Sequence, residues 1–183
     1  MNSLISPKAP RRVMTGLRQG KSVFVSDGPA PNAHAYASLP GHMTSVVYST
    51  ASHPTLPQSE EEQAPPRMHV PPMPGETRLM IVAFPPDTVF ASADIGAAIA
   101  EQAEHIPGLI DAFEPDAPGM HRTRTVDYDI VLDGEIWLEL DDGAETLLGP
   151  GDIVVQCGTR HAWRNRSDRN ATLCFVLIGA EAQ

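Results

Sequence analysis

The sequence predicts an all-β protein, either an antiparallel sandwich or an antiparallel barrel, with one helix. The 183 residues include 14 glycines and 18 prolines, which predicts many turns and short elements. Strands this closely spaced leave no room for crossover helices, which favours antiparallel pairing over a βαβ fold. The short strand-like runs from residue 119 onward are 121–132, 135–140, 145–148, 152–156, 161–165 and 171–179.

Glycine- and aspartate-containing turns separate these runs, among them Asp133-Gly134 and Pro150-Gly151. Branched and aromatic residues favour strands, and such turn dipeptides end them. Three earlier segments have the same β-type composition, namely residues 21–26, 43–50 and 77–84. We therefore expect the N-terminal half to add strands to the same β structure.

A proline-rich stretch and a helix lie between these groups of strands. Seven prolines fall between Pro54 and Pro74, a density that excludes helix and interior strand, so residues 53–75 are predicted to be an exposed loop. The helix is expected over about 93–105. Ser92 is the expected N-cap, and an apolar stripe is formed by Ile95, Ile99 and Ile106.

The charge balance limits the classes of partner. Asp and Glu number 23 against 13 Lys and Arg, giving a net charge of −10 at pH 7. Nucleic acid and anionic membrane surfaces bind clustered cations, so neither is an expected partner. No run of 18 apolar residues is present, and the two cysteines, Cys157 and Cys174, lack metal-type spacing. We expect a cytoplasmic protein with reduced cysteines.

Polar residues alternate along the first of the later strands. His121, Thr123, Asp127 and Asp129 occupy odd positions and should share one face, because strand side chains alternate. A polar face inside an apolar barrel is unfavourable unless something binds it. His161 lies 40 residues farther along, and two imidazoles with one carboxylate are typical of a divalent metal site.

At these residues the sequence resembles the cupin superfamily. The first cupin motif, G-x5-H-x-H-x3–4-E-x6-G, matches the stretch from His121 through Asp127 to Gly134. The second, G-x5-P-x-G-x2-H-x3-N, matches residues 151–165. Thr123 stands at the second histidine and Asp127 at the glutamate, while the second motif lacks its proline and is one residue shorter before Gly158.

The resemblance implies a cupin-type antiparallel β-barrel (jelly roll) with an N-terminal strand extension. It covers residues 119–165, about a quarter of the chain. We expect a single cupin domain over 1–183, in which residues 119–179 carry the core motifs and residues 1–118 complete and flank the barrel. A homodimer is expected, since cupins commonly pair through sheet edges or swapped N-terminal strands.

Carried over residue by residue, the resemblance implies His121, Asp127 and His161 as ligands of a divalent metal ion, with Fe, Zn and Mn left open. Asp129 is the candidate general base, and Thr123 is expected to act beside it as a hydrogen bonder. Two further residues are candidates for substrate binding. They are Trp163, which would line the cavity, and Arg160, which would attract an anionic substrate.

The leading hypothesis is a metal-dependent enzyme that acts on an oxygenated organic acid or carbonyl compound. A metal would polarise a substrate oxygen, and Asp127 or Asp129 would move a proton. Lyase, dehydratase, decarboxylase and O2-dependent oxidoreductase reactions all fit. The alternatives are a non-catalytic cupin that binds a small molecule and a metal-free acid–base enzyme that uses His121 with Asp129.

Overall fold

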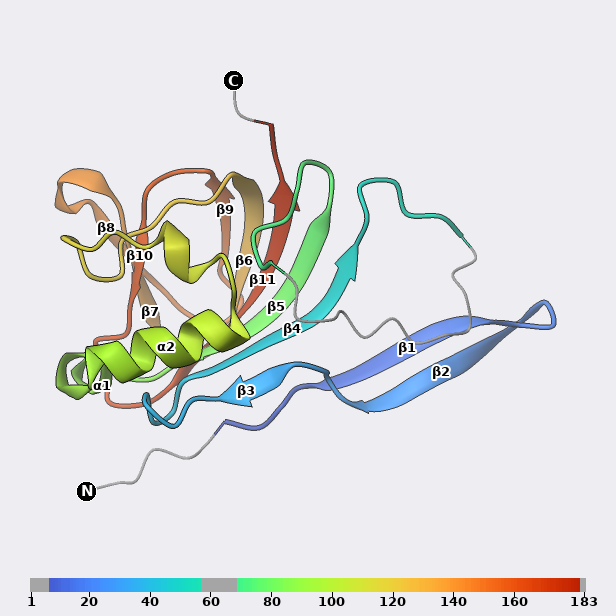
Figure 1. Ribbon diagram of the computed structural model, residues 1–183, viewed down its shortest axis with the longest axis horizontal. Helices are drawn as coiled ribbons and strands as arrows, with labels where there is room; N and C mark the ends of the chain where they lie inside the picture. Colours follow the sequence, from blue (N-terminus) through green and yellow to red (C-terminus); the bar gives the residue numbers. More distant parts are fainter. Residues whose placement is uncertain (1–6, 57–68, 182–183) are drawn as a thin grey trace.

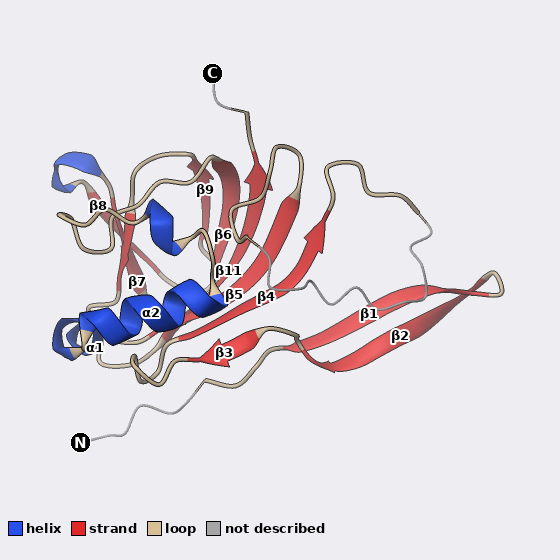
Figure 2. Cartoon of the chain, in the orientation of Figure 1, coloured by secondary structure: helices blue, strands red, loops and turns tan. Residues whose placement is uncertain are grey.

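The computed structural model describes residues 7–56 and 69–181. Within them the chain forms eleven strands, two α-helices and two short 3-10 turns (Figures 1 and 2). The strands are β1 (Arg11–Arg18), β2 (Lys21–Pro29), β3 (Ala33–Ala35), β4 (Met43–Thr50), β5 (Thr77–Phe84), β6 (Thr125–Asp133), β7 (Ile136–Glu139), β8 (Glu145–Leu148), β9 (Ile153–Cys157), β10 (Ala162–Arg164) and β11 (Ala171–Gly179). The helices are α1 (Asp87–Ser92) and α2 (Ile95–His105), and the 3-10 turns are η1 (Ile110–Ala112) and η2 (Asp141–Gly143).

Two antiparallel sheets enclose the core. The larger has six strands in the order β3-β4-β5-β11-β6-β9, and the smaller has the order β10-β7-β8. Leu173 and Phe175 of the larger sheet belong to one apolar cluster with Ile136, Leu138 and Trp163 of the smaller sheet. The predicted all-β jelly-roll fold is therefore confirmed, with every described strand pair antiparallel.

Alternation along β11 and β6 determines what faces the interior. Every second residue of both strands is buried over most of their length, as the strand period requires. At one end of the interior, Leu173 and Ile136 are 0% exposed, whereas Phe175 is 8% and His121 9% exposed toward the other. The end that carries Leu173 and Ile136 is thus completely buried, and the end that carries His121 is slightly more exposed.

A two-stranded arm, β1 and β2, extends away from this body (Figure 1). It turns at Gln19 and Gly20, both of which have positive φ, and Arg11 forms an ion pair with Asp27 at 2.6 Å. Sequence reasoning missed β1, because its basic residues conceal a strand whose apolar residues, including Leu17, remain exposed. β2 was expected to end near residue 26 but runs to Pro29.

The helical region differs from the expectation of one helix over 93–105. Ser92 lies in the last turn of α1, where its hydroxyl donates to the carbonyls of Thr88 and Val89, so it caps no following helix. Asp94 is the N-cap of α2 and accepts a hydrogen bond from the Ala97 amide. The missed helix α1 has only 6 residues, too few for periodicity to reveal.

The predicted apolar stripe of α2 is also wrong in part. Ile95 and Ile99 are exposed, and the buried residue of the helix is Ala98, which packs with Tyr36 and Leu39. A small residue allows the helix to lie close over the β3–β4 connection. Glu101 secures that contact by accepting hydrogen bonds from His34 and from the backbone and hydroxyl of Ser38.

The proline-rich loop expected at 53–75 lies partly outside the described residues, which omit 57–68. Residues 53–56 are exposed, as predicted. Val70 is buried, however, and its amide donates to the Pro107 carbonyl at 2.9 Å, so the end of the stretch packs onto the body. No helix of residues 7–56 and 69–181 is long and apolar enough to cross a membrane.

Candidate active site

The two motif histidines meet at one end of the barrel. The His121 amide donates to the His161 carbonyl at 2.9 Å, and the His161 amide donates back to the His121 carbonyl at 3.0 Å. The centroids of the two imidazole rings are 4.2 Å apart, and the Phe113 ring stacks on His121 with a centroid distance of 4.5 Å. The geometric expectation that these distant imidazoles converge in the barrel is confirmed.

Backbone carbonyls fix the tautomer of both rings. Nδ1 of His121 lies 3.1 Å from the Gly119 oxygen, and Nδ1 of His161 lies 2.9 Å from the Thr159 oxygen. A carbonyl can only accept, so each Nδ1 carries the proton and each Nε2 keeps its lone pair. Burial, followed by the neighbouring His161, lowers the pKa of His121 to about 4, and burial lowers the pKa of His161. Both rings are neutral at pH 7.

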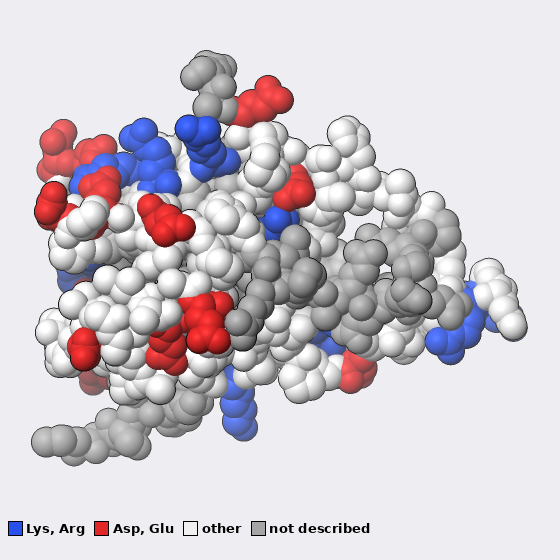
Figure 3. Space-filling model, viewed as in Figure 1, with Lys and Arg blue, Asp and Glu red and all other residues white. Residues whose placement is uncertain are grey.

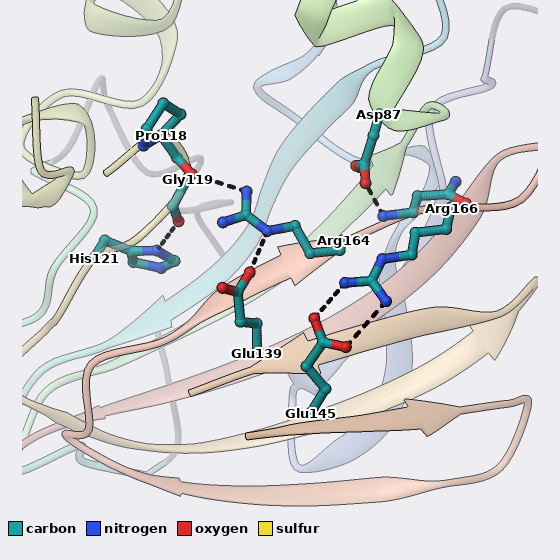
Figure 4. A network of polar contacts seen from close by, with 9 residues as sticks. Asp87, Pro118, Gly119, His121, Glu139, Glu145, Arg164 and Arg166 are labelled. Carbon is teal, nitrogen blue, oxygen red and sulfur yellow. Dashed lines mark hydrogen bonds and ion pairs between the residues drawn. The ribbon is translucent and has the colours of Figure 1, made fainter. Parts of the chain in front are cut away.

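An arginine holds the segment that orients His121 (Figure 4). The Arg164 guanidinium donates to Glu139 at 2.6 Å and to the Pro118 carbonyl at 2.8 Å. The next carbonyl, that of Gly119, accepts from the His121 ring. Arg164 therefore holds the peptide immediately before the one whose oxygen sets the tautomer of His121.

Two carboxyl groups face the interior from β6. Asp127 is buried and Asp129 is 1% exposed, and neither oxygen of Asp129 has a hydrogen-bond partner among the residues that the structure describes. Burial raises the pKa of Asp127 to about 6, offset in part by a hydrogen bond from Thr125. Burial and the nearby Asp127 charge raise the pKa of Asp129 to about 8. The predicted inward orientation of Asp129 is confirmed.

Gln156 is an interior residue that sequence reasoning missed. It lies on β9 directly opposite Asp127, it is 3% exposed, and its Nε2 has no hydrogen-bond partner. It stands two residues before Gly158, at the proline of the second motif. The sequence did contain a signal for this residue. Where the motif has proline, the chain has a polar residue, and strand alternation places its side chain on the inward face.

The donors do not fit the three-ligand metal centre that the resemblance implies. Across residues 7–56 and 69–181, no group of three or more His, Cys, Asp or Glu side chains is placed to hold a metal ion. His121 and His161 meet, but Asp127 does not complete a set with them. Asp127 projects from strand β6, whereas the histidines pair through the isolated bridge that precedes it.

The other predicted residues have defined surroundings. Thr123 is buried, and its hydroxyl bonds that of Thr125 at 2.6 Å. Trp163 lies in the interior with its ring edge-on to His161, at a centroid distance of 5.9 Å, and to Phe175, at 5.7 Å. Because Phe175 is the cross-strand partner of Asp129, these aromatic rings connect the histidine end to the carboxyl groups.

Arg160 is already engaged by two carboxylates. Its guanidinium donates to both oxygens of Glu114, at 2.8 and 2.7 Å, and to Asp141 at 2.7 Å, which offsets its charge. It lines a cleft of about 280 Å³ together with Met120 and Arg164. Met120 and Arg160 each precede one of the paired histidines, so the cleft flanks the outer side of the histidine bridge.

Comparison with known proteins yields local sequence matches. The chain is 60% identical over 63 residues to Phomopsin biosynthesis cluster protein C′ of Diaporthe leptostromiformis, which covers 34% of the chain and 33% of that protein. It is 40% identical over 87 residues to Oryzines biosynthesis cluster protein J of Aspergillus oryzae, covering 47% of the chain and 45% of that protein. The matches thus span about a third to a half of these relatives.

A third relative carries the family in its name. The cupin-domain-containing oxidoreductase fogC of Aspergillus ruber is 43% identical over 75 residues, covering 38% of the chain and 36% of that protein. The solved cupin_2 domain of an XRE family transcriptional regulator from Enterobacter cloacae superposes with a TM-score of 0.35 at 14% identity, over 57% of this chain and 83% of that domain. No family model matches the sequence. The cupin resemblance read from the two motifs is confirmed by these named relatives and by the jelly-roll sheets of the chain itself.

Proposed function

We propose that this protein is an enzyme that transfers protons on an oxygenated organic acid or carbonyl compound held inside the barrel. One observation carries the proposal. Asp129 is almost completely buried, and both of its oxygens lack a partner among the described residues, beside a second buried carboxyl, Asp127. Buried carboxyl groups whose environments separate their pKa values are typical of acid–base sites.

The two carboxyl groups have different protonation states near pH 7. With a pKa of about 6, Asp127 is mainly ionised and can accept a proton from the carbon next to a carbonyl group. With a pKa of about 8, Asp129 is mainly protonated and can donate to the carbonyl oxygen. The product of this step is an enol, which can be reprotonated at another carbon or expel a leaving group.

The histidine pair supplies neutral acceptors at one end of the barrel. Each Nε2 lone pair can accept a hydrogen bond from a substrate hydroxyl, since Nδ1 is committed to a backbone carbonyl. Trp163 and Phe175 provide an apolar lining between the histidines and the carboxyl groups. Such an arrangement selects a small molecule with a polar group at one end and an apolar body.

A second candidate is the metal-dependent enzyme expected from the resemblance, including an oxidoreductase. One observation favours it: histidine ligands of metals donate their other ring nitrogen to a carbonyl or carboxylate, as both histidines do here. Relatives named oxidoreductases and biosynthesis cluster proteins also support it. His121 and His161 would then be the protein ligands, and the metal would supply Lewis acidity toward a substrate oxygen.

Deuterium incorporation tests the proposed function. The full chain is incubated in D2O with a panel of 2-oxo acids, 2-hydroxy acids and enones, and exchange at carbon is followed by mass spectrometry. We expect exchange that is lost in Asp129→Asn, persists in the surface control Asp168→Asn and survives removal of metal by a chelator. Exchange that persists in Asp129→Asn would contradict the role of Asp129, and exchange with no compound would contradict proton abstraction beside a carbonyl.

Elemental analysis separates the second candidate. About one transition-metal ion per chain, lost in His121→Ala and His161→Ala together with turnover, would favour the metal-dependent enzyme. Turnover that is equal before and after chelation would favour the metal-free reaction.

A further inference from the structure

Buried polar atoms without partners gather on the inner faces of β6 and β9. They are Oδ1 of Asp127, both carboxyl oxygens of Asp129 and Nε2 of Gln156. All three residues are more than nine-tenths buried. Buried polar groups in folded proteins are almost always hydrogen-bonded, because an unpartnered one has lost its water without compensation. Several such atoms together indicate that a further molecule completes their hydrogen bonds.

Asp127 and Gln156 are placed to act as a pair. They lie directly opposite each other in the β6–β9 register, and both side chains face inward. Directly opposed residues have Cβ atoms roughly 4.5–5.5 Å apart, so one small chemical group can contact both side chains. Although they are neighbours, Oδ1 of Asp127 and Nε2 of Gln156 have no hydrogen bond to each other.

The chemistry of the pair defines what it can bind. Oδ1 of Asp127 is a carboxyl oxygen that can accept a hydrogen bond, whereas Nε2 of Gln156 only donates. The complementary group offers an N–H or O–H donor next to a carbonyl oxygen. A hydroxy-carbonyl compound and a carboxamide both present such an edge, but a simple ketone lacks the donor.

We infer that Asp127 and Gln156 form a substrate-binding subsite that recognises a donor group adjacent to a carbonyl oxygen. The subsite deepens the proposed function and rests on it, because it holds the oxygenated end of the substrate beside Asp129. Gln156 acts here as a specificity residue.

Side-chain NMR of the full 15N-labelled chain tests the inference. The amide resonance of Gln156 is assigned by its loss in Gln156→Met, with Gln102→Met on α2 as the matched control. The probes are hydroxyacetone and acetamide, which carry donor and carbonyl, and acetone, which carries the carbonyl alone. We expect a saturable shift of the Gln156 resonance with one of the first two, at an affinity at least tenfold above that for acetone. The responding probe identifies the donor as hydroxyl or amide.

Two variants separate this inference from the proposed function. Asp127→Leu replaces the carboxyl group with a similarly branched pair of methyl groups and so removes the acceptor. It should weaken binding of the responding probe tenfold or more, whereas Asp129→Asn should leave the Gln156 response in place. Equal responses to all three probes, no saturable response, or unchanged binding in Asp127→Leu would overturn the subsite. The comparison of probes on the wild-type chain decides the question even if a variant fails to fold.

Discussion

His121 and His161 are joined through their backbones, with two amide-to-carbonyl hydrogen bonds of 2.9 and 3.0 Å between them. Their relative position is therefore set by the backbone, and each ring is oriented by the hydrogen bond of its Nδ1 to a carbonyl. This bridge places one end of each motif at the same end of the barrel.

Gly119 connects this bridge to Arg164, which predicts a specific effect of Gly119→Ala. The residue has a φ of +82°, and an added Cβ would lie 2.6 Å from the Arg164 guanidinium. Positive φ alone costs about 1–3 kcal/mol for a residue other than glycine. We expect Gly119→Ala to lower the free energy of unfolding, measured in urea, by more than Gly143→Ala does. Gly143 is the matched control, because it has a φ of +72° but nothing within 4 Å of the added Cβ.

Equal losses of stability in the two alanine variants would show that the contact between Gly119 and Arg164 contributes nothing beyond backbone strain.

Neutral buried histidines predict that the fold is sensitive to acid. Burial lowers the pKa of His42 to about 4, and its Nδ1 donates to the Ala83 carbonyl. Because the folded-state pKa lies below the unfolded value of about 6.5, the stabilisation is complete above pH 6.5 and is lost as the pH falls toward 4. The contribution of His42 alone to this loss should be about 2–3 kcal/mol between pH 7.5 and 4.5, measured by urea denaturation as the difference between wild type and His42→Asn. His42→Asn, which retains a donor, should reduce this pH dependence, whereas the exposed control His53→Asn should not.

The raised pKa of Asp129 predicts a contribution to the free energy of unfolding that depends on pH in the opposite direction. Its folded-state pKa is raised to about 8, above the ordinary value of 3.8, so the fold favours the protonated acid. The cost of keeping it buried grows as the pH rises from about 4 to 8, because only the unfolded chain ionises freely there. Asp129→Asn should therefore stabilise the protein relative to wild type by an amount that increases over this range, on the order of a few kcal/mol. A stability difference that is constant with pH would contradict a protonated Asp129.

The buried side-chain amide of Gln156 predicts that this residue does not stabilise the fold. Its Nε2 is buried without a partner, so replacing it with an apolar residue of similar size removes an uncompensated polar group. We expect Gln156→Met to unfold at the same urea concentration as wild type or at a higher one. A midpoint well below that of wild type would assign Gln156 a structural role in the barrel.

Much of the barrel could be predicted from strand alternation. The inward face of Thr125, Asp127 and Asp129 follows from their odd positions, and β5, β8 and β11 have the predicted bounds. β6 begins at Thr125 rather than at residue 121, because residues 121–124 pair only through the histidine bridge. Local pattern cannot show where a strand joins its neighbour.

The composition of the site was harder to predict than its location. The motif spacing located both histidines, but it did not show that no group of three or more ligand-type side chains forms among residues 7–56 and 69–181. The engagement of Arg160 by Glu114 and Asp141 likewise depends on residues 46 and 19 positions away. Gln156 was not predicted, because the second motif has proline at this position and assigns no role to a polar side chain there.

The 13C NMR titration of the Asp129 side chain tests the central claim most directly. In a chain labelled at aspartate carboxyl carbons, the Asp129 resonance is the one that disappears in Asp129→Asn. Its chemical shift, followed from pH 4 to pH 10, should change with a midpoint near 8, in the range that a proton donor needs at neutral pH. A midpoint below pH 5 would show a carboxylate ionised in the resting protein and would contradict the acid–base site.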